Sequence, residues 1–242
     1  MQKHSKVRRI AQFSFGILFA TALIIAPIVS AQSDPQFQER ITQIKLALAL
    51  NKELIGGYTW EEQQTISIKG QVKKQALYQV QMGADGQLQK TELDPATPPS
   101  EGRSHGIKHR IVAEKTEEFD TYAKQLGELA QLYLGGQPGR LHELYQTGGV
   151  TFGPASTPQE VRIILNSYAK PGDSATIVFN TTQNAVQSIK ISSYLNDHKD
   201  AVNIDAQYRQ EPNGMSHVAV LVLDGVSKHL TIETQSSNYR LI

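Results

Sequence analysis

The chain has 242 residues, of which 39% are hydrophobic and 19% are charged, and it contains no cysteine. This balance excludes a wholly disordered chain, and the lack of cysteine excludes disulfides, thiolate metal sites and a cysteine nucleophile. A formal net charge of +1 provides no electrostatic footprint for nucleic acid, so we expect no nucleic-acid partner. The composition favours a folded protein that is stabilised by its hydrophobic core.

The first 31 residues have the layout of a secretory signal peptide. A basic run over Lys3–Arg9 precedes an apolar stretch over Phe13–Val29, and Val29-Ser30-Ala31 places small residues where a signal peptidase cuts. We expect cleavage near Ala31 and a periplasmic or secreted protein of residues 32–242, with membrane contact only through the signal peptide. The alternative is an uncleaved membrane anchor, although the stretch is short for a span of about 20 residues.

Apolar spacing predicts four helices in the mature chain. The first covers 37–54, where apolar residues recur every three or four positions, and Gly56-Gly57 ends it. The second covers 115–134 and the third, a short one, covers 138–145. A fourth is predicted from Thr157, because Thr157-Pro158-Gln159-Glu160 offers a cap, a first-turn proline and the acid of a capping box.

Alternation of apolar and polar residues predicts eight strands, three before the helices and five after them. The last two are joined by Asp224-Gly225, which predicts a two-residue hairpin. Between the two sets of strands, the segment 94–109 is rich in proline and glycine and is predicted to be a flexible loop. We therefore expect one α+β domain over 32–242: a strongly curved antiparallel sheet of about eight strands, forming an unclosed half-barrel with helices packed across its concave face.

Motifs for catalysis or for binding a metal or cofactor are not recognisable in the sequence. His105 and His109 are four residues apart, but they lie in the proline- and glycine-rich segment; with Glu114 they form the only local cluster of interest. His217 and His229 flank the predicted hairpin, and its register would place them on opposite faces of the sheet. We expect no catalytic residue, no metal and no cofactor, and a hydrolase is the least favoured function.

Aromatic side chains are the best candidates for a binding site, and they allow two interpretations. They can be core residues whose polar tips find partners, or they can line a cavity between helices and sheet that holds an acyl chain or a peptide. The candidate ligand-binding residues are Tyr58, Trp60, Tyr78, Tyr122, Tyr133 and Tyr168.

Five short motifs are distinctive: Gly57-Tyr58-Thr59-Trp60, Leu134-Gly135-Gly136, Val150-Thr151-Phe152-Gly153-Pro154, Tyr168-Ala169-Lys170-Pro171-Gly172-Asp173 and Ser193-Tyr194-Leu195. With the expected order of elements, they resemble the periplasmic half-barrel proteins of the outer-membrane lipoprotein carrier class, particularly its poorly characterised exported relatives. In that class an unclosed barrel shields lipid acyl chains under a helical lid. The resemblance implies a non-catalytic carrier for an apolar ligand, such as a lipid acyl chain or a lipoprotein. The alternative is a structural or interaction protein of the cell envelope that docks another protein through a sheet face or edge.

Overall fold

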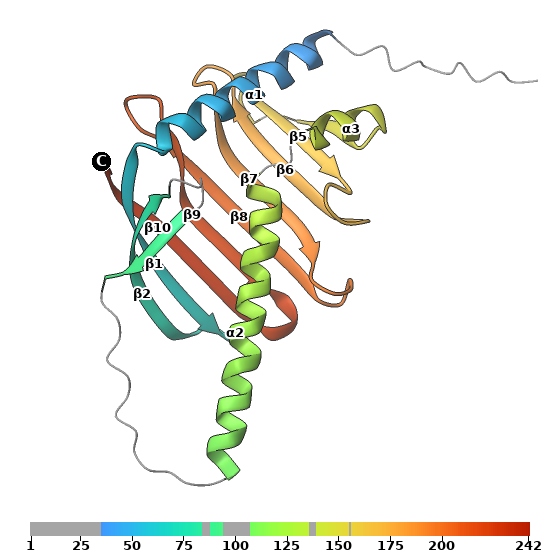
Figure 1. The fold of residues 1–242 in the computed structure, drawn as a ribbon. Coiled ribbons are helices and arrows are strands. Elements are labelled where there is room, and N and C mark those ends of the chain that lie inside the picture. The colour runs from blue at the N-terminus through green and yellow to red at the C-terminus, as the bar shows by residue number, and fades with distance from the viewer. Residues whose placement is uncertain (1–34, 84–87, 94–106, 136–138, 155) are drawn as a thin grey trace, which may run out of the picture. The chain divides into compact units, whose positions relative to one another are not determined.

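The computed structural model describes residues 35–83, 88–93, 107–135, 139–154 and 156–242. The chain divides into a unit of residues 1–32 and a unit of residues 33–242. The predicted signal peptide and its cleavage site lie outside the described residues, as does most of the expected loop at 94–109. The second unit contains one large antiparallel sheet and three described α-helices (Figure 1).

The sheet has ten strands in the order β3-β2-β1-β10-β9-β8-β7-β6-β5-β4. All neighbouring strands are antiparallel, and the sheet is unclosed because β3 and β4 form its two edges. The strands are β1 (Tyr58–Ile68), β2 (Gln71–Met82), β3 (Leu88–Glu92), β4 (Val150–Gly153), β5 (Glu160–Asn166), β6 (Ser174–Asn180), β7 (Ala185–Tyr194), β8 (Ala201–Gln210), β9 (Ser216–Gly225) and β10 (Leu230–Leu241). The pairing of β1 with β10 joins the first three strands to the other seven.

The expected count of eight strands is wrong because the segment predicted as a fourth helix is strand β5. In β5 the side chains of Val161, Ile163 and Leu165 are buried in alternation, as a strand between β4 and β6 requires. The capping signal instead forms a turn, in which the Glu160 N–H donates to the Thr157 carbonyl over 3.1 Å. The other strand that the sequence did not predict is β4, which has only four residues.

The last two strands form the predicted hairpin, but its expected two-residue turn at Asp224-Gly225 is wrong. Leu223 pairs with Ile232, and Gly225 still pairs with Leu230, so β9 continues to Gly225. A short 3₁₀ segment, Val226–Lys228, makes the turn, which ends at His229 with a left-handed φ of 50°. His217 and His229 therefore lie near opposite ends of the β9–β10 hairpin, and they form no pair.

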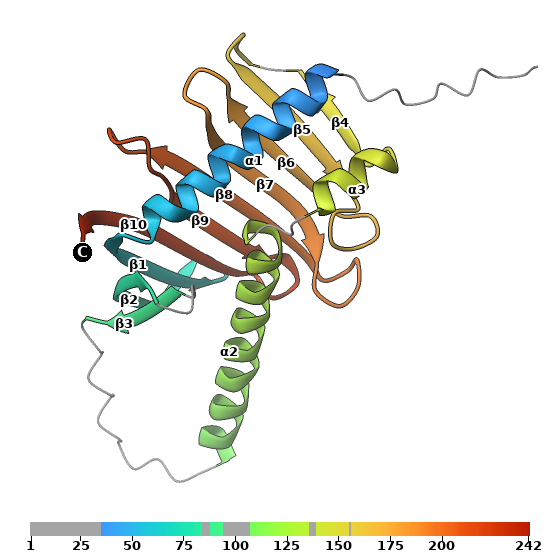
Figure 2. The same cartoon turned by 45° about the horizontal axis from the view of Figure 1, so that its top comes forward.

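Three helices each contribute buried apolar side chains to one core with the sheet. They are α1 (Pro35–Ile55), α2 (Ile107–Leu134) and α3 (Arg140–Gln146), and α2 begins eight residues before its predicted start. Figure 2 shows α1 and α2 on the same face of the sheet. The helical members of the core are Ile44, Tyr122, Leu126, Leu129, Ala130, Tyr133 and Leu144. None of the helices in the described part of the chain is long and apolar enough to cross a membrane.

The middle of α2 rests on the end of β9, and this contact requires glycine there. A Cβ atom on Gly225 would overlap the ring of Tyr122. We predict that Gly225→Ala lowers the free energy of unfolding by about 1–3 kcal/mol, because neither the ring nor the strand can move without loss of packing. Gly127→Ala is the matched control: it meets nothing within 4 Å on α2, so the free energy of unfolding should rise by up to about 1 kcal/mol. Urea unfolding measures both, and equal effects would contradict the contact.

Candidate functional site

Residues from two of the sequence motifs meet in a buried polar network around Asp173. Tyr133 of α2 donates its hydroxyl hydrogen to Asp173 Oδ2, and its oxygen lies 2.8 Å from Ser193 Oγ on β7. The backbone N–H groups of Tyr168 and Lys170 both donate to the Asp173 carboxylate over 2.6 Å. Because Asp173 is only 3% exposed, these bonds offset the cost of burying its charge.

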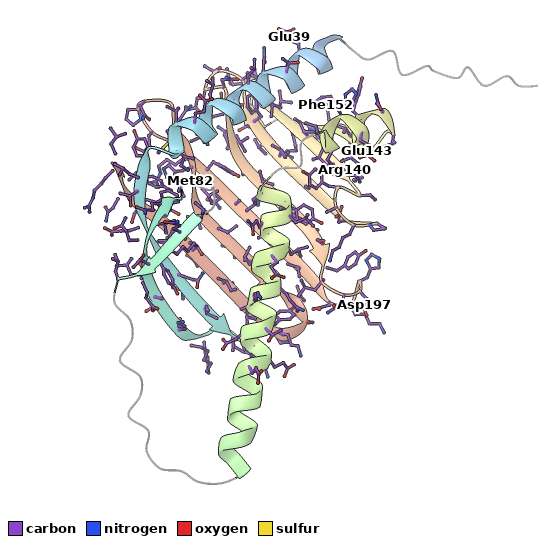
Figure 3. All side chains as sticks on the ribbon, viewed as in Figure 1. Glu39, Met82, Arg140, Glu143, Phe152 and Asp197 are labelled. Carbon is purple, nitrogen blue, oxygen red and sulfur yellow. The ribbon has the colours of Figure 1, made fainter. Side chains whose placement is uncertain are left out.

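Two basic side chains near the Asp173 network, Lys170 and Arg140, hydrogen-bond to backbone carbonyls. Lys170 donates through Nζ to the carbonyls of Tyr194 and Leu195, at 2.6 and 2.7 Å. Arg140, which lies at the start of α3 (Figure 3), donates to the carbonyls of Ser167 and Tyr168. The motifs Tyr168–Asp173 and Ser193–Leu195 thus tie α2, α3 and β7 together, and their main polar groups are engaged within the protein.

One depression is an open cleft of about 490 Å³ beside α2 that is lined by charged and polar residues. Tyr122 and Asp200 form part of its wall, and the Tyr122 hydroxyl donates to Asp200 Oδ1 over 2.8 Å. Lys228 binds Glu118 across the cleft. The remaining lining residues are Glu117, Thr121, Gln125 and Asn196. With three carboxylates in its wall, this cleft does not suit an apolar ligand.

A second depression, which we call the α1 groove, differs from this cleft in having no charged residue among those that line it. It has a volume of about 260 Å³ and lies between α1 and residues of β7, β8 and β9. Its apolar lining residues are Ala47, Leu50 and Leu54 of α1 and Ala185 and Val186 of β7. Its other lining residues are Asn51, Gln183, Asn184, Tyr208, Gln210, Asn213, Gly214 and Ser216. Among the described residues that line the α1 groove, none carries a charge.

Hydrogen bonds fix the position of α1 and of the turns that line the α1 groove. Asn51 of α1 accepts the Ser216 N–H through Oδ1 over 2.5 Å, which fixes the helix to the start of β9. Gln210 donates through Nε2 to the carbonyls of Gln183 and Gly214 and so links the turns at one end. Ile44, one turn before Ala47, is buried in the core and anchors α1.

Three of the six candidate residues lie in the main core. Tyr122, Tyr133 and Tyr168 are buried, and the rings of Tyr133 and Tyr168 have centroids 5.6 Å apart. Of these three, Tyr122 also lines the polar cleft. The hydroxyls of Tyr122 and Tyr133 are bonded as described above, which is the arrangement expected of core tyrosines.

The other three candidates lie on β1 and β2. Trp60 is buried, stacks on Tyr239 with centroids 5.4 Å apart, and donates its indole N–H to Glu62 over 3.0 Å. Tyr78 is half-buried opposite Glu62 in the register. Tyr58 accepts a hydrogen bond from Asn213, so it lies beside a residue of the α1 groove. The six candidates therefore do not converge on one cavity.

Sequence reasoning missed the residues of the α1 groove. Leu50 and Leu54 of the α1 groove are four residues apart on α1, on a different face from the buried Ile44. This second apolar stripe was a readable signal, because a helix that only packs on a core needs one stripe. The positions of Tyr208 and Ser216 had no such signal, since their meeting depends on the β8–β9 register.

The histidines and carboxylates of the described part of the chain do not gather into a group that could hold a metal ion. No group of three or more potential metal ligands occurs there. His217 is buried, with Nε2 2.9 Å from Glu211 Oε1 and its ring 3.9 Å from that of Tyr239. His105 and the side chains of His109 and Glu114 lie outside what the structure describes.

No protein-family model matches the chain, and no curated protein matches it. Among solved structures, it is similar to a DUF1329 family protein from Desulfovibrio piger, with a TM-score of 0.35 and 9% identity over 83% of this chain and 92% of that one. A LolA superfamily protein from Nitrosomonas europaea has a TM-score of 0.38 and 9% sequence identity. The match covers 82% of this chain and 93% of that one. An outer membrane lipoprotein-sorting protein domain from Vibrio parahaemolyticus has a TM-score of 0.41 and 10% sequence identity. The match covers 84% of this chain and 92% of that one. These are proteins of the class that the sequence motifs resemble.

The Asp173 network leads to a stability prediction. Asp173→Ala leaves the Tyr133 hydroxyl and the backbone donors without their acceptor, so we expect the free energy of unfolding to fall by about 2–4 kcal/mol. Asp197→Ala is the control, because the exposed Asp197 (Figure 3) only accepts the Lys199 N–H in a turn and its loss should cost less than about 1 kcal/mol. Urea unfolding of both variants tests this, and an equal loss would show that the network is not stabilising.

Buried tyrosines make the stability depend on alkaline pH. Burial raises the pKa of Tyr122 and of Tyr208 to about 12 from the usual 10.0, and it also raises the pKa of Tyr133 and Tyr239. The native protein holds these protons more tightly than the unfolded chain does. Their contribution to stability is therefore complete below pH 10 and is lost as the pH rises towards 12.

We expect the urea midpoint to fall steeply between pH 10 and 12, and Tyr208→Phe to make this fall shallower. Tyrosinate absorbance provides the second measurement, because the buried tyrosines should ionise only as the protein unfolds. Titration of all nine tyrosines near pH 10 in the folded protein would contradict the prediction.

Proposed function

We propose that the protein is an exported, non-catalytic binding or carrier protein for an apolar ligand, such as a lipid acyl chain or the acyl chain of a lipoprotein. The observation that carries this proposal is the α1 groove, an uncharged depression whose lining includes Ala47, Leu50 and Leu54 of α1 and Ala185 and Val186 of β7 beside polar residues. Residues 1–31 would direct the chain to the periplasm or the outside of the cell. In this function the unclosed sheet and α1 would together hold the ligand.

The size of the α1 groove fits one chain. Its volume of about 260 Å³ lies just below the roughly 300–1,000 Å³ that is usual for ligand pockets. Each buried methylene contributes about 0.8 kcal/mol, whereas association costs at least about 4 kcal/mol in lost freedom. A segment of about ten methylenes would thus be held weakly enough to be released, which suits a carrier.

One observation favours the alternative, an interaction protein that docks a partner through a sheet edge. Strand β3 is an edge, and Leu88 on it, Leu93 just after it and Val72 on the adjacent β2 are exposed apolar residues. Exposed apolar side chains at an unpaired edge are a feature of docking surfaces. The two functions are distinguished by whether the purified protein binds a small apolar probe in the α1 groove.

The α1 groove can be tested with two leucines that differ only in position. Leu50 lines the α1 groove and is 58% exposed, whereas Leu46, one turn earlier on α1, is 59% exposed and is not among the lining residues. We predict that Leu50→Asp weakens binding of the fluorescent apolar probe N-phenyl-1-naphthylamine by about tenfold or more, because a charge is placed against the bound apolar surface. Leu46→Asp should change the affinity by less than about twofold, since it carries the same charge and helix-propensity cost outside the α1 groove.

Mass spectrometry of the purified protein under native conditions should in addition detect lipid that copurifies with it. If neither the probe nor a lipid binds, the carrier function is wrong. If both leucine variants weaken binding equally, the ligand is bound elsewhere. Capture of an envelope protein that is lost with Leu88→Asp, in the absence of probe binding, would establish the alternative.

A further inference from the structure

Strand β3 ends one side of the sheet, and its outer edge has no neighbouring strand in the described part of the chain (Figure 2). We propose that this edge pairs with the same edge of a second copy of the chain. The two β3 strands run antiparallel about a two-fold axis at Thr91, so the sheet continues from one copy into the other. This surface is separate from the α1 groove, because none of the residues Leu88–Glu92 lines that groove.

The backbone of β3 offers free hydrogen-bonding groups at alternate residues. The Leu93 N–H donates to the Leu77 carbonyl over 2.8 Å, so the backbone groups of Leu93 point towards β2. In an antiparallel ladder this direction alternates from one residue to the next. Lys90 and Glu92 therefore point their N–H and C=O groups away from β2, to the open edge. An edge strand of this kind is a template for pairing with another chain.

Charge decides the register of the two copies. In a pair of copies related by a two-fold axis, the residue on the axis faces itself, and a residue before it faces the one equally far after it. An axis at Lys90 or at Glu92 would bring like charges together, which is destabilising. An axis at Gln89 would leave Lys90 opposite Leu88. Only an axis at Thr91 places Lys90 opposite Glu92 of the second copy, twice by symmetry, and these two residues also carry the outward backbone groups.

The side chains in this register are available for the contact. Among the described residues, none forms a hydrogen bond or an ion pair with the Glu92 carboxylate. Lys90 binds Glu62 of its own chain, but its side chain is 40% exposed and its ammonium group has three donors, so it can bind a second carboxylate. On the other face of the sheet the two Thr91 side chains meet, and threonine pairs across strands are stabilising. The second copy thus supplies an acid that a foreign strand need not have.

The contact is small, so we expect the dimer to be weak. A pairing of one five-residue strand per copy buries less than the roughly 1,200 Å² of a standard interface. Leu93 is 47% exposed and lies opposite Gln89 of the second copy in this register, which adds some apolar area. We expect a monomer–dimer equilibrium with a dissociation constant of about 10–100 µM.

A cysteine on the axis tests the register directly, because the chain has no cysteine of its own. In this register the Cα atoms of the two Thr91 residues are about 4.5 Å apart, within the range of a disulfide. Oxidised glutathione should therefore cross-link more than about half of Thr91→Cys when the protein is at about 100 µM. Gln89→Cys is the matched control, since it is exposed on the same side of β3 but lies about 13 Å from its own copy. Less than about a tenth of it should cross-link.

Sedimentation velocity over about 1–500 µM measures the dimer itself, on protein that is produced from the full chain and purified in its exported form. Glu92→Lys places ammonium groups opposite each other, so it should raise the dissociation constant by about tenfold or more. Glu128→Lys is the control, because it makes the same change of charge at an exposed position of α2, and it should change the constant by less than about twofold. If thermal unfolding shows that Glu92→Lys does not fold, Glu92→Pro replaces it, since proline there removes an outward N–H but no bond to β2.

Three results would overturn the inference. They are a wild-type protein that stays monomeric at about 500 µM, equal cross-linking of the two cysteine variants, and an unchanged dissociation constant in the folded Glu92 variant. Capture of a different envelope protein through β3, by a wild-type protein that does not dimerise, would also overturn it. None of these results affects the proposed function, because binding in the α1 groove is tested separately with Leu50→Asp.

Discussion

The architecture depends on the pairing of β1 with β10. This ladder runs from Tyr58 opposite Leu241 to Ile68 opposite Leu230, and it joins strands that are more than 150 residues apart in the chain. Because α1 leads directly into β1, the ladder also determines where the C-terminal end of α1 lies on the sheet. The α1 groove exists only because a helix from the start of the described chain is held against strands from its end.

Much of the sheet could be predicted from the sequence because its strands have one buried face. Strands β1, β2 and β8 alternate clearly, and α1 and α3 lie within a few residues of their predicted limits. Strand β5 could not be assigned in this way. Over seven residues, Val161, Ile164 and Leu165 satisfy the spacing of a helix as well as Val161, Ile163 and Leu165 satisfy that of a strand. Only the pairing with β4 and β6 makes the segment a strand and not a helix, and the sequence of the segment itself does not contain that information.

The candidate site was harder to predict than the fold. Aromatic residues are conspicuous in the sequence, but Tyr133 and Trp60 are buried with their polar atoms bonded to Asp173 and Glu62. Motif residues such as Lys170 likewise hold loops together. The α1 groove is instead built from ordinary residues, whose role arises from where α1 lies on the sheet. Periodicity reveals the leucines on α1, but it cannot reveal which strand residues they face.

The open edge at β3 carries an ion pair that bears on how readily another strand could extend the sheet. Lys90 on this five-residue strand binds Glu62, which is buried on β1. A foreign strand that extended the sheet here would have to cover this partly exposed ammonium group, which is unfavourable. A charge on an edge strand disfavours uncontrolled extension of a sheet, so any strand that docked at β3 would have to accommodate the Lys90–Glu62 pair.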